Sequence, residues 1–174
     1  LKTTNGGSNW STESSGTSVN LRDIYMYDVS NGWAVGQDGG LILKYSDSIA
    51  PTVTSVSSTA TDSTYGIGSV IPITMTFSES VIVTGTPQLT LETGDTDAVV
   101  DYSSGSGSSV LTFNYTVVSG HVSSDLDYKS TTALELNGGT IKDAAGNAAT
   151  LTLPTGGATG SLSANKAIVI DWRY

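Results

Sequence analysis

The sequence predicts an all-β fold, in which an antiparallel β segment over residues 1–47 precedes a β-sandwich over residues 48–174. Apolar residues make up 37% of the 174 residues, and they are mainly Val, Ile, Leu and Tyr, which suit strands better than helices. Only 13% of the residues are charged, and Gly, Ser and Thr take their place, which is typical of short strands joined by many turns. Several segments alternate polar and apolar residues, as strands with one buried face do.

The first segment contains a repeat. Residues 1–5, Leu-Lys-Thr-Thr-Asn, return as residues 43–47, Leu-Lys-Tyr-Ser-Asp, at an offset of 42 residues. A period of about 40 to 45 residues fits one four-stranded propeller blade. Because one blade cannot bury both of its faces, we expect either that this segment belongs to a longer repeat array or that it packs on the second domain or on a neighbouring subunit.

Residues 3–10 resemble the Asp-box hairpin, Ser-x-Asp-x-Gly-x-Thr-Trp, with matching residues at Thr3, Asn5, Gly7 and Trp10. Residues 23–28 and 32–36 are similar to blade strands of photosystem-assembly-factor-type propellers. Two adjacent glycines permit the tight turn, and Trp10 is expected to fold over the hairpin. We interpret these as folding residues, because Asp boxes in sialidases lie away from the catalytic site.

The second segment predicts one sandwich. In residues 71–77, the apolar side chains of Ile71, Ile73, Met75 and Phe77 share one face, and residues 111–117 repeat the pattern. Turn-forming clusters, such as residues 94–97 and 104–107, separate the strands. No helix of ordinary length is expected. The expected strands cover residues 52–56, 70–77, 88–92, 99–102, 110–117, 134–136, 150–153 and 167–170.

The second segment resembles the bacterial Ig-like repeats of large surface adhesins and other cell-surface proteins. The matching stretches are residues 47–53, 73–79, 87–91, 126–128, 141–147 and 167–171. The resemblance implies an Ig-like β-sandwich at an extracellular or cell-surface location, in contact with neighbouring modules of the same chain or with identical subunits.

Composition excludes several functions. The net charge is −9, and the 7 Lys and Arg residues are scattered, so the clustered positive charge that a nucleic-acid or anionic membrane surface needs is missing. The absence of Cys excludes disulfides and thiolate chemistry. No run of about 18 apolar residues predicts a membrane span. Residues 1–7 are not a signal peptide, so for a secreted protein we expect that signal to have been removed or to lie outside this sequence.

Oxygen-bearing side chains predict a hard-cation site at one end of the sandwich. Asp47 ends the first segment, Glu79 follows an alternating strand, and Asp143 and Asn147 flank a Gly-containing turn. Calcium takes six to eight oxygen ligands, and the family resemblance implies calcium at junctions between repeats. The alternative is that Asp143 and Asn147 cap a turn and that Glu79 is a solvated edge charge. Asp125 and Asp127 form a second, weaker candidate group.

No residue is predicted to be catalytic or to bind an organic cofactor. His121 is the sole His and has no Cys beside it, which makes a poor zinc site. A pair of glycosidase carboxylates is conceivable among Asp95, Asp97 and Asp101, but turn chemistry explains Asp95 and Asp97 better. Trp33 and Trp10 can stack on a sugar, although aromatic residues at blade positions usually belong to the core.

Three functions remain open. The first is a non-catalytic structural or adhesive module of a bacterial surface protein, stiffened by calcium at the module junction. The second is a self-assembling filament or sheath subunit that uses strand complementation. The third is a carbohydrate-binding module of a secreted enzyme, with a cell-surface glycan as its partner.

Overall fold

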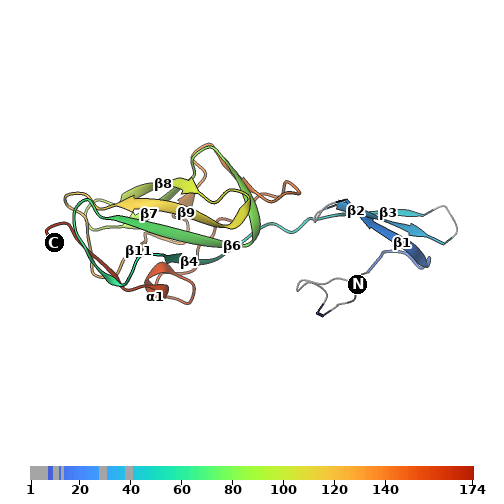
Figure 1. The fold of residues 1–174 in the computed structure, drawn as a ribbon, viewed down its shortest axis with the longest axis horizontal. Helices are drawn as coiled ribbons and strands as arrows, with labels where there is room; N and C mark the ends of the chain where they lie inside the picture. Colours follow the sequence, from blue (N-terminus) through green and yellow to red (C-terminus); the bar gives the residue numbers. More distant parts are fainter. Residues whose placement is uncertain (1–7, 10–11, 13, 28–30, 38–40) are drawn as a thin grey trace. The chain divides into compact units, whose positions relative to one another are not determined.

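The fold is described from a computed structural model, which covers residues 8–9, 12, 14–27, 31–37 and 41–174. The chain divides into two compact units, Leu1–Ser48 and Ile49–Tyr174, each of which is described by itself (Figure 1). The all-β prediction is confirmed. Within the described residues, the only α-helix is the single turn α1 (Leu162–Asn165).

The first unit contains a three-stranded antiparallel sheet in the order β1 (Leu21–Met26), β2 (Asn31–Gly36) and β3 (Ile42–Ser46). Tyr25 pairs with Trp33, which in turn pairs with Lys44. Large apolar side chains on both faces are exposed, among them Ile24 at 69% and Tyr25 at 65%. The Asp-box residues Thr3, Asn5, Gly7 and Trp10 lie outside the described residues.

The second unit is built from short strands and one long strand. An eight-stranded sheet runs in the order β11-β7-β8-β9-β6-β13, with β12 beside β7 and β4 beside β6, and a smaller sheet has the order β10-β14-β5. The bounds are β4 (Val53–Ser58), β5 (Ser63–Tyr65), β6 (Val70–Thr84), β7 (Gln88–Glu92), β8 (Ala98–Ser104), β9 (Ser108–Thr116), β10 (Val122–Ser123), β11 (Asp127–Tyr128), β12 (Leu134–Glu135), β13 (Thr140–Lys142) and β14 (Ile168–Asp171).

The core of this unit comes from the alternation that the sequence shows. Ile71, Ile73 and Met75 in β6 are completely buried, and Phe77 is 2% exposed. On the neighbouring strand β9, Phe113 is paired directly with Ile73 and is also buried. Burying one such side chain contributes about 1.5 to 3 kcal/mol. These two strands therefore anchor a sandwich-like unit.

Three expectations about the strands need correction. Strand β6 continues beyond the predicted end at Phe77 to Thr84, through a register shift between Thr76 and Val81. Residues 150–153 form no strand and contribute only the isolated bridge between Thr52 and Thr150. The short strands β5, β10, β11 and β13 were not predicted, because two or three residues are too few to show a period.

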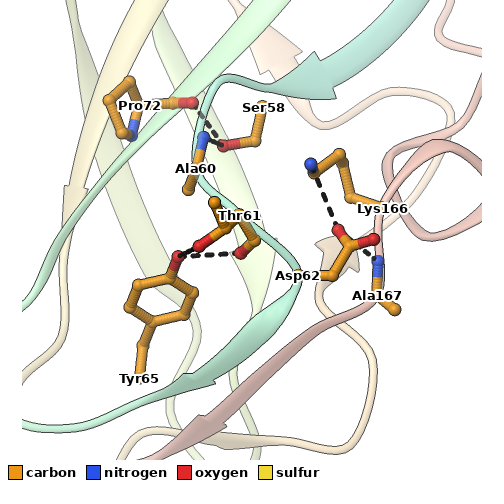
Figure 2. A network of polar contacts seen from close by, with 8 residues as sticks. All are labelled: Ser58, Ala60, Thr61, Asp62, Tyr65, Pro72, Lys166 and Ala167. Atoms are coloured by element: carbon orange, nitrogen blue, oxygen red, sulfur yellow. Dashed lines mark hydrogen bonds and ion pairs between the residues drawn. The ribbon is translucent and has the colours of Figure 1, made fainter.

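Polar contacts hold β5 parallel to β14 (Figure 2). Asp62 pairs with Lys166 at 3.1 Å and accepts a hydrogen bond from the Ala167 amide at 3.2 Å. The hydrogen bond from Lys166 holds the pKa of the Asp62 carboxyl below its usual value. Nearby, the Tyr65 hydroxyl donates to the Thr61 carbonyl at 2.8 Å. The corner between β4 and β5 is therefore tied to the segment that enters the last strand.

Candidate metal centre

The turn after β13 presents Asp143. This side chain is only 4% exposed, and its Oδ1 accepts a hydrogen bond from the Asn147 amide at 2.8 Å. The Asn147 side-chain nitrogen donates to Asp143 Oδ2 at 2.7 Å. Gly146 allows the chain to close, because it adopts a φ of 95°, which glycine tolerates far better than other residues. The sequence Asp-Ala-Ala-Gly-Asn therefore folds into a turn that fixes one carboxylate.

Glu79 lies inside the long strand β6 rather than at the end of a strand, as the sequence had suggested. The register of β6 against β9 shifts between Thr76 and Val81, which places Glu79 within an irregular stretch. Irregularities of this kind bend a strand and redirect its side chains. The Glu79 side chain is half-buried.

The segment that enters the second unit is fastened beside these residues. Thr52 and Ser78 form two hydrogen bonds: the Ser78 amide donates to the Thr52 carbonyl at 2.8 Å, and the Thr52 amide donates to the Ser78 hydroxyl at 3.0 Å. The Asn147 side-chain nitrogen also donates to the Ile49 carbonyl at 3.3 Å. The entering segment thus meets both the β6 irregularity and the Asp143 turn.

Asp47 precedes this fastened segment and is half-buried. One carboxylate oxygen from each of Asp47, Glu79 and Asp143 lies within 4.8 Å of the other two. Three carboxylates so close repel one another unless a cation or protons offset their charge. The group can therefore hold a metal ion, and its all-oxygen donors suit a hard cation.

Asn147, the fourth predicted ligand, is hydrogen-bonded directly to Asp143, and its part in metal binding stays a prediction. Its side-chain nitrogen lies between two acceptors, Asp143 Oδ2 and the Ile49 carbonyl, and this arrangement fixes which end of the amide is nitrogen. Asn147 therefore orients Asp143 and links it to the entering segment. Ser78 was missed as a fastening residue, although it stands directly before Glu79 in the predicted Phe-Ser-Glu stretch.

In the second candidate group, Asp125 and Asp127, the carboxylate of Asp127 ties separate segments of the second unit together. Asp127 Oδ2 accepts hydrogen bonds from the Ser163 hydroxyl at 2.6 Å and from the Gly157 amide at 3.2 Å. Burial and the neighbouring carboxylates of Asp127 and Asp62 raise the pKa of Asp125. In the part of the chain that the structure describes, the Asp47–Glu79–Asp143 group is the one place where three His or acidic ligand atoms gather.

The residues weighed for catalysis have structural contacts. His121 is 7% exposed, and its Nδ1 lies 3.0 Å from the Tyr115 hydroxyl. The His121 and Tyr115 rings also stack on each other. Burial lowers the pKa of His121. Asp97 pairs with Lys129, and Asp101 accepts a hydrogen bond from the Gln88 side chain at 2.8 Å. Asp97 lies before the first residue of β8, whereas Asp101 lies within this strand, so the two carboxylates do not come from one regular strand.

Comparisons with known proteins give no relative: no family model, no curated protein and no solved structure matches this chain. Among the described residues, no helix is both long enough and apolar enough to cross a membrane. Function must therefore be argued from the geometry of the chain itself.

Proposed function

We propose that this chain is an extracellular, non-catalytic structural or adhesive module of a bacterial surface protein, and that calcium bound by Asp47, Glu79 and Asp143 stiffens the segment entering its sandwich. The observation that carries the proposal is the gathering of these three carboxylates within 4.8 Å. The resemblance of residues 47–171 to bacterial Ig-like repeats supports the location and the structural role.

Calcium is favoured over other metals by the chemistry of the donors. The group offers carboxylate oxygens and no sulfur or imidazole, whereas zinc sites in proteins usually include Cys or His. The half-buried Asp47 and Glu79 leave room for water ligands, and calcium accepts six to eight oxygens in flexible geometry. Magnesium demands a stricter octahedron, so it is expected to bind more weakly.

The proposed role of the ion is mechanical. Asp47 belongs to the segment that enters the sandwich, whereas Glu79 and Asp143 belong to β6 and to the turn after β13. An ion shared by the three would join the entering segment to two separate parts of the unit. It would also offset the repulsion among the carboxylates. Bending of this segment would then require bonds between the carboxylates and the ion to break.

The experiment compares thermal unfolding in calcium and in chelator for the wild type, Glu79→Gln and Glu135→Gln. Glu79→Gln removes a proposed ligand and keeps its size, while Glu135, exposed on β12, is the matched control. Calcium should raise the melting temperature of the wild type and of the control and should raise that of Glu79→Gln much less. Equal increases in all three proteins would refute the site.

A self-assembling subunit is the second candidate, and one observation favours it. The β1–β3 sheet carries exposed apolar side chains on both faces, including Tyr25 at 65% and Ile42 at 71%, and Tyr27 directly after β1 is 72% exposed. Exposed apolar patches commonly mark interaction surfaces. Sedimentation velocity tests this candidate: assembly that Ile42→Ser and Tyr27→Ser weaken supports it, and a monomer at all concentrations contradicts it.

A further inference from the structure

Strands β8 and β9 form a hairpin whose arms separate. Their pairing is limited to Tyr102 with Phe113 and Ser104 with Thr112. Beyond these pairs, residues 98–101 of β8 pair only with β7, and residues 114–116 of β9 pair only with β6. The described residues provide no further strand pairing between the two arms. A groove of about 440 Å³ lies where they part.

Each arm turns toward this groove main-chain groups that take part in no strand pairing between β8 and β9. The Tyr102 amide donates toward β7, to the Pro87 carbonyl. Because the N–H and C=O groups of a strand alternate between its two edges, those of Val99 point away from β7. The Val117 amide donates to the Ser69 carbonyl, on the β6 side, so the groups of Thr116 point away from β6. Val99 and Thr116 both line the groove.

The side chains of the groove give it a charge preference. Asp97 and Asp101 line it, together with the polar side chains of Asn114 and Thr116. Asp97 already pairs with Lys129, whereas Asp101 accepts a hydrogen bond from the neutral Gln88 amide. A second Asp97 oxygen is buried and has no hydrogen-bond partner among the described residues. His121 and Tyr115, the remaining titratable groups of the lining, are buried against each other.

We propose that the groove between β8 and β9 is a docking site for an extended peptide segment of a partner protein that carries a Lys or Arg side chain. The main chain of the peptide would pair with the edges at Val99 and Thr116, which is the hydrogen-bonding pattern that an added strand supplies. The basic side chain would meet the carboxylate of Asp101. This inference does not depend on the metal site, which lies on other residues.

The test titrates ¹⁵N-labelled protein, in chelator, with the acetylated and amidated peptide Thr-Val-Thr-Lys-Thr-Val-Thr. We expect saturable shifts confined to the amides of residues 97–101 and 114–121, with a Kd below roughly 1 mM. Replacing the central Lys of the peptide by Glu should weaken binding at least about tenfold, which is 1.4 kcal/mol. A peptide with alternate N-methylated amides, which cannot pair as a strand, should not bind.

A charge reversal on the protein provides the matched control. The Asp101 side chain is exposed, so Asp101→Lys should leave the dispersed spectrum unchanged while exchanging the preference from the Lys peptide to the Glu peptide. Three results would overturn the proposal: no shifts at these amides with any peptide, shifts that ignore both charge changes, or shifts that grow with protein concentration alone, which would assign the groove to a second copy of this chain.

Discussion

The Asp143 side chain is buried, and both of its carboxylate oxygens accept hydrogen bonds. Its carboxylate receives the main-chain amide and the side-chain amide of Asn147, and hydrogen bonds to an ionised carboxylate are among the stronger ones in proteins. Both donors come from one residue four positions along the turn. The orientation of Asp143 therefore depends on the turn, and the turn depends on Gly146.

Gly146 is the residue at which this dependence can be tested. It has a φ of 95°, and an added Cβ would meet no atom within 4 Å. Gly146→Ala should therefore act through backbone strain alone and should cost about 1 to 2 kcal/mol in the free energy of unfolding. Chemical denaturation measures the loss. A change below about 0.3 kcal/mol would mean that the turn relaxes without strain.

His121 predicts a pH dependence of stability. Burial lowers its pKa in the folded state below the ordinary histidine value of about 6.5, so on acidification the unfolded chain takes up the proton first. Stability from this group is thus fully present above pH 6.5 and is lost as the pH falls from 6.5 toward the lower folded pKa. Tyr115 contacts the ring, and the carboxylates of Asp97 and Asp101 line the same groove as His121.

Urea unfolding at pH 7.5 and at pH 5.5 checks this prediction. The wild type should be less stable at pH 5.5, and His121→Gln, which cannot take up a proton, should lose most of the difference. Any difference in stability between the two pH values that remains in His121→Gln would come from the carboxylates. An equal difference in the wild type and in His121→Gln would show that His121 binds its proton equally well in the folded and the unfolded chain.

At the scale of the element, β6 organises the second unit. Its first half pairs with β4 and β9, and its last residues pair with β13. The burial of β6 alternates along its whole length, so Glu79 falls on the same face as the buried Ile73. One face of this strand therefore serves both the core and, beside the register shift against β9, the candidate metal group.

Matched substitutions in β6 should separate its buried positions from its exposed ones. Ile73 is fully buried, whereas Ile82 is 48% exposed. Ile73→Ala should cost about 2 to 5 kcal/mol in the free energy of unfolding, since it leaves a cavity. Ile82→Ala should change stability by only about 0.5 kcal/mol, as is usual at exposed positions. Denaturation midpoints of the two variants provide the measurement, and similar losses would contradict the burial pattern.

How far the elements could be predicted depended on their length. The alternation of residues 71–77 and 111–117 indicated β6 and β9, because several periods are visible in each. Residues 150–153 alternate as well, yet they form a single bridge, since tertiary neighbours decide whether a short extended stretch joins a sheet. The extension of β6 past Phe77 was hidden by Ser78 and Glu79, which look like the end of a strand.

At the scale of the whole molecule, the two units differ in how they bury apolar side chains. The second unit has one core, to which most of its strands contribute. The β1–β3 sheet of the first unit leaves Ile24 and Ile42 largely exposed, and Tyr27, directly after β1, is exposed as well. A sheet with apolar side chains on both faces gains stability when further layers cover it. That the first segment packs on a neighbour stays a prediction.

The candidate metal group shows what sequence reasoning can and cannot find. Oxygen-bearing side chains near the segment entering the sandwich pointed to Asp47, Glu79 and Asp143, and their oxygens lie together. The hydrogen bonds between Asp143 and Asn147 match the alternative in which these two residues cap a turn. The bond from the Asn147 side chain to the Ile49 carbonyl could not be predicted, because that main-chain atom comes from a distant part of the chain. The hairpin opening between β8 and β9 likewise has no local sequence signal.

The most direct test of the calcium proposal is calorimetric titration of metal-free protein with calcium, read together with its melting curve. Saturable binding of one ion per chain is expected, and a hundredfold excess over Kd should add about 2.7 kcal/mol to the free energy of unfolding, a rise on the order of 10 °C in melting temperature. Asp47→Asn should weaken binding and reduce the rise. No calcium binding to the metal-free protein, or a melting temperature unchanged between calcium and chelator, would contradict the account.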